Sequence, residues 1–452
     1  MSATTGPTAL PCRLIGGPHA RVLDDDLDDL VRSAVADAGL HGQDVVLVIP
    51  DGTRSCPLPL LVGTLHRHLS PVVRSLTAVI ALGTHSYMEA HEIDQLLGVG
   101  GEGQPASLAE AYPGLSVVNH EWADPSMLVE VGTIPAARIR ELSEGRLDRD
   151  APIVINRRVV EADTAIVVGP VFPHEVVGMS GGNKYFIPGV ASQEFIDMTH
   201  WVGALITSTE IIGTTGITPV RAMIDEGSRM IPTRRLALCC VVRSGTGDLE
   251  AAAFGTPEEA WAAAASIASQ THVEWLDAPM QRVIAVMPTR YDDIWTAAKG
   301  GYKTEPAIAD GGEVVIYAPH VSEVSEVHHE IYDIGYHCRD YFVKQWADFQ
   351  HIHWGVLAHS THLRGQGTYD PETGQEQLRI RVTLATQIPE SVCTRINLGY
   401  LDPDTVDLQA LSEEPGTTVI PNAGEVLYRV RPAAGGPVEP RTTSSTGSTD
   451  DS

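Results

Sequence analysis

The chain has 452 residues, which is too long for one ordinary hydrophobic core and predicts two domains. Its 31 Lys and Arg residues against 58 Asp and Glu residues give a formal net charge of -27, which excludes nucleic acid as an expected partner because polyphosphate would be repelled. No stretch approaches the roughly 18 apolar residues of a membrane span, and residues 1–14 lack a signal-peptide pattern, so no membrane role is expected.

Apolar runs alternate with amphipathic stretches in the first half of the chain. Each β-branched run is followed by turn residues and then by a segment with helical spacing. Such continuous apolar strands separated by helices indicate a mainly parallel α/β sheet that is covered on both faces. The predicted strands are residues 45–49, 76–82 and 165–169, and the predicted helices are residues 57–69 and 88–97.

A second α/β unit is expected after an alanine-rich helix at residues 257–270. Its predicted strands are residues 282–287, 313–317 and 380–385, with a mainly helical segment from about Asp292. The expected division is an N-terminal domain of residues 1–270, to which residues 412–430 return, a second domain of residues 275–411, and a disordered tail of residues 432–452 rich in Gly, Pro, Ser and Thr.

Polar side chains follow the predicted strands of the first domain. Asp51 and Arg54 come after the first strand, His85 after the second and His174 after the third. Ligands of open α/β sheets bind at the carboxyl ends of the strands, so these four residues are the first indication of a site. The Asp51–Arg54 turn fits an anion site at a helix start, although a capping Asp with a solvated Arg explains it equally well.

The six cysteines show no CxxC spacing, and Cys239 and Cys240 are adjacent within a hydrophobic strand. This pattern predicts structural thiols in a reduced cytoplasm rather than a disulfide framework. The expected location is therefore cytoplasmic.

The strongest local signal is a glycine-rich loop at residues 173–189 that contains Lys184. A phosphate loop would need Ser or Thr after the lysine, but Tyr185 stands there. Three interpretations remain open: a pyridoxal Schiff-base lysine without an evident pyridinium partner, a solvated structural lysine, and a lysine that attaches some other cofactor.

Of the 18 histidines, His85 and His174 are set apart by their strand-end position, and His200 follows Lys184 by sixteen residues. A lone histidine is more often structural than catalytic. Three histidines could hold zinc, yet no HExxH motif is present, so a zinc-dependent hydrolase or lyase is the weaker alternative.

Taken together, these segments resemble the nickel-pincer lactate racemase family. The lysine loop carries most of the resemblance, which extends from about residue 10 to Arg429. The matching segments are the Asp51–Arg54 turn with Pro57, Gly83–His85, Asn156–Arg158 with Glu161–Asp163, PHxxxGxSGGxKxxxPG at 173–189, His200 and the Pro421–Gly424 turn.

The resemblance implies a cofactor, the nickel-pincer nucleotide, which is a pyridinium-3-thioamide-5-thiocarboxylic acid mononucleotide that holds nickel. It implies that Lys184 is the tether and that His200 is the protein ligand of nickel, which imidazole suits. Protein made without the cofactor-biosynthesis proteins, which are expected partners, would be the apo form. The other residues implied to contact the cofactor are Asp51, Thr53, Gly181, Gly182 and Trp354.

The resemblance also implies an isomerase, a racemase or epimerase that inverts carbon 2 of a small 2-hydroxy acid. Hydride transfer to and from the cofactor would give a 2-keto acid intermediate, with His85 and His174 as acid and base. Arg54 would bind the substrate anion, and Lys299 would hold the carboxylate or polarise the carbonyl. Because Lys299 belongs to the second domain, the active site is expected in a cleft between the domains.

The chain departs from the lactate enzymes at Thr296, where they carry glutamine, so Thr296 is the expected selectivity residue. The substrate therefore stays open among lactate, malate, aryl-lactate and sugar acids. Lys303, four residues after Lys299, would either meet a second carboxylate or be a solvated lysine. A non-enzymatic carrier of a nucleotide-type cofactor is the third alternative.

Overall fold

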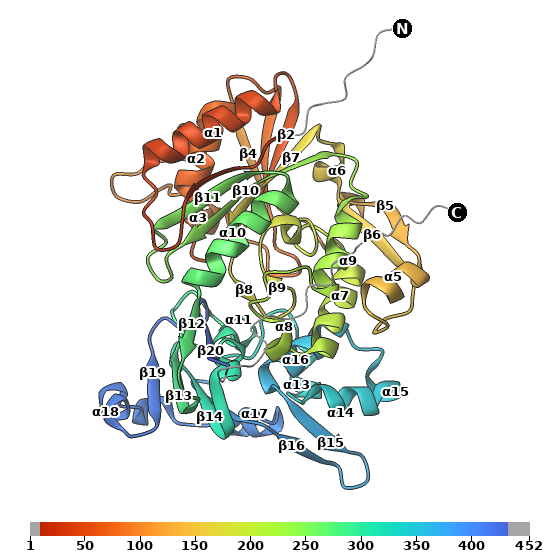
Figure 1. Ribbon diagram of the computed structural model, residues 1–452, viewed down its shortest axis with the longest axis vertical. Coiled ribbons are helices and arrows are strands. Elements are labelled where there is room, and N and C mark those ends of the chain that lie inside the picture. Colours follow the sequence, from red (N-terminus) through yellow and green to blue (C-terminus); the bar gives the residue numbers. More distant parts are fainter. Residues whose placement is uncertain (1–9, 433–452) are drawn as a thin grey trace.

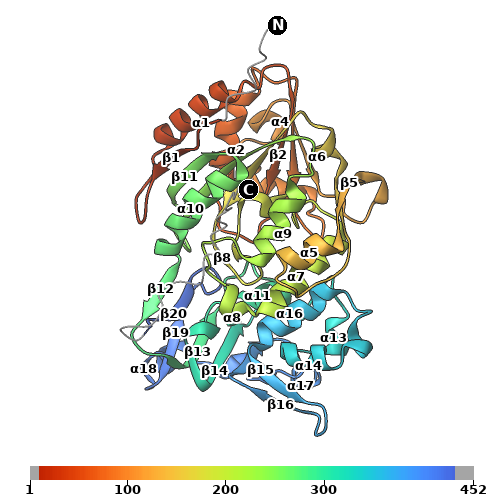
Figure 2. The same ribbon diagram turned by 45° about the vertical axis from the view of Figure 1, so that its right-hand side comes forward.

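Residues 10–432 are described by the structure, a computed structural model of the chain. It contains a seven-stranded sheet and a five-stranded sheet. In Figures 1 and 2 the first sheet lies in the upper half of the molecule and the second in the lower half. The predicted class, two α/β units with mainly parallel sheets, is confirmed. The predicted tail lies outside the described residues apart from Pro432.

The seven-stranded sheet has the order β1-β11-β10-β7-β2-β3-β4. The five strands from β10 to β4 run parallel, whereas β11 is antiparallel to both of its neighbours. The bounds are β1 Arg13–Gly16, β2 Asp44–Ile49, β3 Ser75–Ile80, β4 Leu115–Asn119, β7 Thr164–Pro170, β10 Arg234–Val242 and β11 Leu249–Gly255.

Helices cover both faces of this sheet, and two small hairpins lie beside it. The helices are α1 Asp24–Ala38, α2 Leu58–Leu69, α3 Ala90–Leu96, α4 Leu108–Ala111, α5 Ala136–Leu142, α6 Arg157–Glu161, α7 Gln193–Ile206, α8 Ser208–Ile211, α9 Pro219–Ser228 and α10 Pro257–Thr271. The hairpins are β5 Leu128–Ile134 with β6 Ala151–Asn156, and β8 Pro173–His174 with β9 Gly178–Met179.

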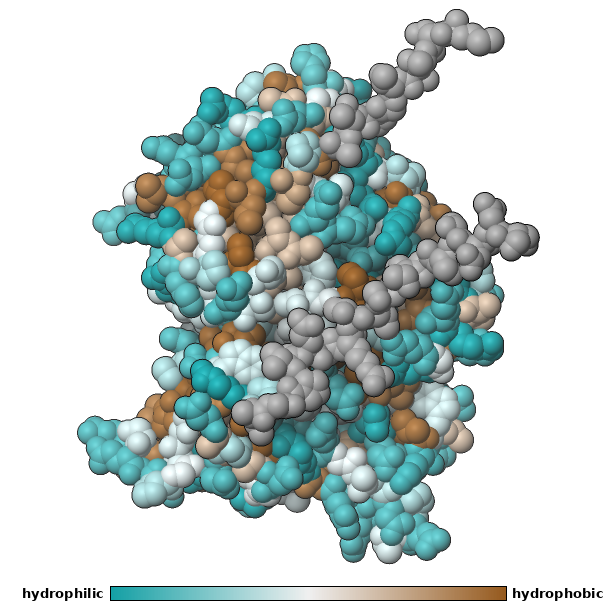
Figure 3. All heavy atoms as spheres, viewed as in Figure 1, coloured by the Kyte–Doolittle hydropathy of each residue, from teal (hydrophilic) through white to brown (hydrophobic). Residues whose placement is uncertain are grey.

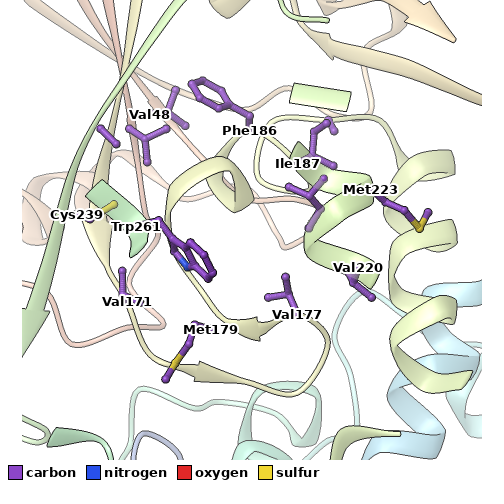
Figure 4. Packing of buried hydrophobic residues seen from close by; sticks show 14 of the residues in the cluster. Val48, Val171, Val177, Met179, Phe186, Ile187, Val220, Met223, Cys239 and Trp261 are labelled. Carbon is purple, nitrogen blue, oxygen red and sulfur yellow. The ribbon is translucent and has the colours of Figure 1, made fainter. Parts of the chain in front are cut away.

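The central strand β2 explains why the apolar runs of the sequence are continuous. Val45 and Leu47 pack into the cluster formed with α1 and α2, whereas Val46 and Val48 pack into the cluster formed with α7, α9 and α10. Successive strand residues point to opposite faces, so a sheet that is covered on both faces needs an apolar residue at every position. Figure 4 shows the second of these clusters around Trp261.

The five strands of the second sheet are all parallel, in the order β18-β17-β14-β13-β19. The strands are β13 Met280–Val286, β14 Ile308–Ala318, β17 Arg381–Thr386, β18 Gly399–Tyr400 and β19 Thr417–Ile420, with a hairpin of β15 Gly367–Asp370 and β16 Gln375–Leu378. The helices are α11 Ile294–Ala297, α12 Lys299–Tyr302, α13 Ile331–Ile334, α14 Arg339–Lys344, α15 Trp346–Phe349, α16 Trp354–Arg364, α17 Glu390–Arg395 and α18 Leu408–Glu413.

Several contacts join the halves of the molecule, two of them between whole elements. Helix α7 packs against α16, and β12 (Val273–Leu276) pairs in parallel with β20 (Leu427–Val430). The structure differs here from the expectation that residues 412–430 return to the first domain, because β19 pairs with β13 in the second sheet. A strand as short as β19 takes its position from the strand it pairs with, and the order of elements along the chain does not reveal that partner.

The surface agrees with the acidic composition. Hydrophilic residues predominate over the face drawn in Figure 3, with scattered hydrophobic patches. Within residues 10–432, no helix combines the length and the apolar character that crossing a bilayer requires.

Candidate active site

One cavity of about 190 Å³ collects side chains from both halves of the molecule. Its walls come from the carboxyl ends of β2, β3 and β7, from the lysine loop and α7, and from α11, α12 and α16 of the second half. The residues predicted from the sequence that line it are Asp51, Thr53, Arg54, His85, His174, Gly181, Lys184, His200 and Lys299.

Asp51 and His85 form a hydrogen-bonded pair at neighbouring strand ends. His85 Nδ1 lies 2.6 Å from Asp51 Oδ2, while Thr53 donates to Asp51 Oδ1 from its backbone nitrogen at 3.1 Å and from its hydroxyl at 2.6 Å. Burial alone would raise the pKa of Asp51, but the hydrogen bond and charge of His85 outweigh it and lower that pKa well below its usual value. A neutral His85 therefore carries its proton on Nδ1 and leaves Nε2 as a free acceptor.

His174 lies in the β8–β9 hairpin and is 4% exposed. Its Nδ1 accepts a hydrogen bond from the backbone N–H of Val176 at 3.1 Å, so a neutral ring carries its proton on Nε2. Burial, followed by the positive charges of Lys184 and Arg54, lowers the pKa of His174 well below its usual value. His174 is thus a neutral donor at pH 7, the opposite state to that of His85.

Lys184 is carried by a short 3-10 turn, Gly182–Tyr185, that follows β9. Gly181 has φ +85, and a Cβ there would lie 2.6 Å from Val171 Cγ2, so this position requires glycine. The carbonyls of Gly181 and Met179 accept hydrogen bonds from the buried guanidinium of Arg221. Burial and the charge of Arg54 lower the pKa of Lys184 to about 8, so its amine is more nucleophilic at neutral pH than that of a surface lysine.

His200 is presented by α7. Its Nδ1 lies 2.7 Å from the carbonyl oxygen of Ile196, one turn earlier, and donates to it. Nε2 is therefore the unprotonated nitrogen and faces the cavity, as expected of a metal-binding imidazole whose second nitrogen is held by a carbonyl. Burial and the charge of Lys184 lower the pKa of His200 to about 4, which favours the neutral ring that a metal would require.

Two cations of the cavity have no anionic partner: within the described residues, the side chains of Arg54 and Lys299 make no hydrogen bond and no ion pair. Lys299 is 6% exposed and lies 4.8 Å from the ring centroid of Tyr291. Burial and the charge of Arg54 lower the pKa of Lys299 to about 7. A carboxylate that enters the cavity would supply the missing counter-charge for both groups.

Gly182, Thr296 and Trp354 do not line the cavity. The Thr296 hydroxyl and backbone nitrogen both bind Asp293 Oδ1 at 2.9 Å, as part of a helix cap. Trp354 donates from Nε1 to the carbonyl of Gln350 and packs against Trp346 instead.

Lys303 is neither solvated nor free to meet a carboxylate. It is 4% exposed, and its amine donates to the carbonyls of Pro173 at 2.5 Å and Glu425 at 3.2 Å. Both alternatives left open for this lysine are therefore wrong, because its bonds to backbone carbonyls hold two distant segments together.

Several residues that line the cavity were not predicted from the sequence. The sequence holds one signal for them, which is the i, i+3 spacing that puts His359 and His362 on one face of a helix. The missed residues include Glu175, Trp295, Tyr302, His328, His359 and His362.

The residues that are present fit a covalently held nickel nucleotide. Lys184 supplies an amine with a lowered pKa, Gly181 allows the close packing of the lysine loop on Val171, and His200 offers one free imidazole nitrogen. No group of three or more His, Cys, Asp or Glu side chains able to hold a metal occurs within residues 10–432. A single protein ligand suits a metal whose other ligands come from an organic cofactor.

The fold and the cavity define an α/β protein with a strand-end site rich in lysine and histidine. Residues 18–212, less than half of the chain, match the model of the lactate racemase N-terminal domain, so this part of the chain is similar to the lactate racemases. It is 28% identical over 178 residues to the lactate racemase of Lactiplantibacillus plantarum and 26% identical over 162 residues to that of Thermoanaerobacterium thermosaccharolyticum. These alignments cover 39% and 35% of this chain but only 35% and 32% of those enzymes.

Two solved structures share the fold over nearly the whole chain. A protein of Thermotoga maritima is 33% identical with a TM-score of 0.83, and the match covers 92% of this chain and 100% of that one. The lactate racemase apoprotein of Thermoanaerobacterium thermosaccharolyticum has a TM-score of 0.65 with the same coverage, and its 18% identity supports the fold alone.

Proposed function

We propose that this protein is an isomerase that inverts carbon 2 of a small 2-hydroxy acid through a 2-keto acid, with a nickel-pincer nucleotide attached to Lys184. The observation that carries the proposal is that Lys184 and His200 line the same cavity as His85 and His174. When bound, the cofactor supplies a hydride acceptor and donor for carbon 2.

The two histidines handle the proton of the hydroxyl group. His85 accepts it at Nε2, and the Asp51 carboxylate stabilises the imidazolium that forms. His174 donates a hydrogen bond from its Nε2–H to the carbonyl oxygen when that oxygen points to the other side of the cavity, and thereby polarises the carbonyl. The proton that His85 gained returns to the substrate oxygen from His85 or through water, so both rings end the cycle as they began it.

Arg54 and Lys299 hold the carboxylate and polarise the carbonyl. Arg54 offers a planar fork that matches a carboxylate. Lys299 lies on α12 in the second half of the molecule, so the substrate contacts both halves at once. When the carboxylate is held, the 2-keto acid can still rotate about its bond between carbon 1 and carbon 2, and this rotation exposes its opposite face.

Lys184→Arg tests the proposal, because arginine keeps the charge but cannot form the covalent link. In cells that contain the cofactor-biosynthesis proteins, we expect the unchanged chain to gain a mass increment on Lys184 and one nickel per chain. We expect the variant to gain neither and to lose more than about 10³-fold of the inversion rate for 2-hydroxy acids.

Intact-mass analysis, metal analysis and chiral analysis of the 2-hydroxy acid are the measurements. Lys344→Arg, at a lysine that pairs with Asp340 far from the cavity, is the control and should behave like the unchanged chain. Full activity of Lys184→Arg would refute the proposal. Activity gained from zinc alone, without a mass increment, would instead support the hydrolase or lyase alternative.

Variants of the two histidines distinguish the isomerase from a non-enzymatic carrier of the cofactor. If the protein is only a carrier, cofactor loading is its whole function, and His85→Ala and His174→Ala would leave that loading unchanged. Under the proposal, both variants load nickel normally yet lose inversion by roughly 10²–10⁴-fold, the range for a general acid or base.

A further inference from the structure

The lysine loop rests on a buried arginine that the proposed reaction does not use. Arg221 lies in the first turn of α9, is 1% exposed, and is the largest fully buried side chain among residues 10–432. In this part of the chain its guanidinium makes no ion pair, and its Nε has no hydrogen-bond partner. Asp225, one turn later on α9, accepts from Asn183 at 2.9 Å instead. Taking a charge out of water without an opposite charge beside it is costly, so Arg221 needs an explanation beyond packing.

Three successive carbonyls of the lysine loop are held by Arg221 and by Trp261 of α10. The guanidinium donates to the carbonyl oxygen of Met179 at 2.5 Å and to that of Gly181 at 3.1 Å. Between them, the carbonyl oxygen of Ser180 accepts from the indole Nε1 of Trp261 at 3.0 Å. The Cζ of Arg221 lies 4.3 Å from the ring centroid of Trp261, so the two donors stabilise each other through a cation–π contact. The backbone of this segment is thereby fixed at every residue.

The carbonyl of Gly181 connects Arg221 to the turn that carries Lys184. This oxygen accepts from the guanidinium and also, at 3.3 Å, from the backbone nitrogen of Lys184. The same turn of α9 holds the β8–β9 hairpin, because the hydroxyl of Thr218 donates to the carbonyl of Val177 at 3.2 Å and accepts from the backbone nitrogen of Arg221. The start of α9 therefore sets the position of the lysine turn.

The guanidinium also brings a positive charge close to the lysine turn. Within the described residues the amine of Lys184 makes no hydrogen bond and no ion pair, so its surroundings act on it only through burial and charge. Burial lowers the pKa of Lys184 most; the charges of Arg54 and Arg221 lower it further, whereas Glu175 and Asp51 raise it. The charged or titratable groups around this amine are Arg54 and Asp51 after β2, Glu175 and His174 in the β8–β9 hairpin, His200 on α7 and Arg221 on α9.

We propose that Arg221 is a positioning residue for cofactor attachment: it orients the turn that carries Lys184, and its buried charge opposes protonation of the amine. A lysine attacks as a neutral amine, so both effects favour attachment. A neutral donor could hold the carbonyls as well, and the charge is therefore what distinguishes an arginine at this position. This inference rests on the proposed function, in which Lys184 is the point of attachment.

Trace acetylation of the apo protein with acetic anhydride measures the amine directly. The amine displaces acetate from the anhydride and releases its proton to water, so neither cofactor nor nickel takes part. The chain has four lysines, and Lys344 is exposed and lies outside the cavity, which makes it an internal reference. Peptide mass analysis gives the rate at Lys184 relative to the rate at Lys344.

Arg221→Gln removes the charge and keeps a side-chain donor. We expect the relative rate at Lys184 to fall about 3–10-fold at pH 7, because one pKa unit changes the neutral fraction of an amine about tenfold. The difference should shrink below about twofold at pH 10, where the amine is largely neutral in both proteins. Equal rates at pH 7 would overturn the inference, and so would a difference that stays the same at pH 10.

Three further variants keep the inference testable. Arg221→Lys keeps the charge and should retain at least about half of the relative rate at pH 7. If Arg221→Gln does not fold, Trp261→Phe frees the carbonyl of Ser180 without removing the charge, and it should lower the rate about twofold at both pH values; an unchanged rate would overturn the positioning role. Arg229→Gln, at the exposed end of the same helix in a pair with Glu226, is the control and should leave the rate unchanged.

This assay separates the inference from the proposed function. Because acetylation uses neither cofactor nor substrate, its failure would leave the proposed function standing. Full inversion activity of Lys184→Arg would overturn the proposed function, and with it the role of Arg221 in attachment, whatever the acetylation rates.

Discussion

At the scale of single residues, two histidines of one cavity are held in opposite hydrogen-bonding states. The carboxylate of Asp51 takes the Nδ1 proton of His85, whereas the backbone N–H of Val176 occupies Nδ1 of His174. The sequence makes the two residues equivalent as strand-end histidines. Their neighbours leave Nε2 of a neutral His85 as an acceptor and Nε2 of His174 as a donor, so under the proposed function the two enantiomers of the substrate would meet different groups.

Asp51→Asn tests this difference. Asparagine keeps the shape of the side chain but favours the wrong tautomer of His85 and cannot stabilise its imidazolium, so we expect the rate of inversion to fall by about 10²–10⁴-fold. Steady-state kinetics of the cofactor-loaded protein in both substrate directions measures the effect. A loss below about threefold, with cofactor loading unchanged, would contradict the role of Asp51.

The ionised Asp51 carboxylate should also make the free energy of unfolding depend on pH. The pKa of Asp51 is lower in the folded chain than its unfolded value near about 3.9, so its stabilisation is complete above about pH 4 and is lost as pH falls through the folded pKa. At pH 7 we expect Asp51→Asn to lower the free energy of unfolding by about 1–3 kcal/mol, measured with urea. Asp29→Asn, in an exposed pair with Arg32, should cost less than about 1 kcal/mol.

At the scale of elements, the lysine loop depends on glycine for space as much as for backbone conformation. Gly182 has φ +58, and a Cβ there would lie 2.7 Å from Trp261 Cβ and 2.9 Å from the carbonyl oxygen of Pro257. Figure 4 shows Trp261 among the buried hydrophobic side chains of this cluster, with Val171 and Met179 nearby. The loop is thus seated on α10, although Gly182 itself does not line the cavity.

Gly182→Ala, compared with a glycine in open space, should separate the need for positive φ from the need for space. We expect it to lower the free energy of unfolding by more than about 2 kcal/mol, through strain at positive φ and the clash with α10. Gly145→Ala, at φ +81 with open space around it, carries only the conformational strain and should cost about 1 kcal/mol. If chemical denaturation gave the same loss of unfolding free energy for both variants, the close packing at Gly182 would be unimportant.

At the scale of the whole molecule, Glu425 joins three distant segments beside the cavity. Its carboxylate accepts from the backbone nitrogen of Ser55 at 3.1 Å and from the hydroxyl of Ser244 at 3.0 Å, and it lies 3.2 Å from the guanidinium of Arg290. Its backbone carbonyl accepts from Lys303. The segment after β19 thereby ties the Asp51–Arg54 turn to the second half of the molecule.

Glu425→Gln should therefore affect substrate binding as well as stability. Loss of a charge that is 2% exposed and ion-paired is expected to cost about 3–5 kcal/mol of unfolding free energy and to raise KM more than it lowers kcat, because Arg54 loses its support. Glu413→Gln, on the exposed helix α18, is the control. Unchanged KM in a folded Glu425→Gln protein would contradict the positioning role.

Much of the fold and part of the site followed from local patterns. The strand predicted at residues 45–49 is β2, and the helix predicted at residues 57–69 is α2, because burial on both faces demands uninterrupted apolar strands. His85 and Lys184 were found because strand ends and glycine-rich loops are local features. Thr296 and Trp354 were misplaced, since a helix cap and a neighbouring ring, not chain position, decide where those side chains point.

The sequence by itself determined the alternation of strands and helices, the acidic surface and the loop that carries Lys184, because each depends on residues close together in the chain. Only the tertiary structure decided that Trp295, His328 and His362 face the strand-end histidines, and that Lys303 and Glu425 are buried links. The physical reason is that these contacts join segments more than a hundred residues apart, whose packing depends on burial and hydrogen-bond satisfaction in the folded chain.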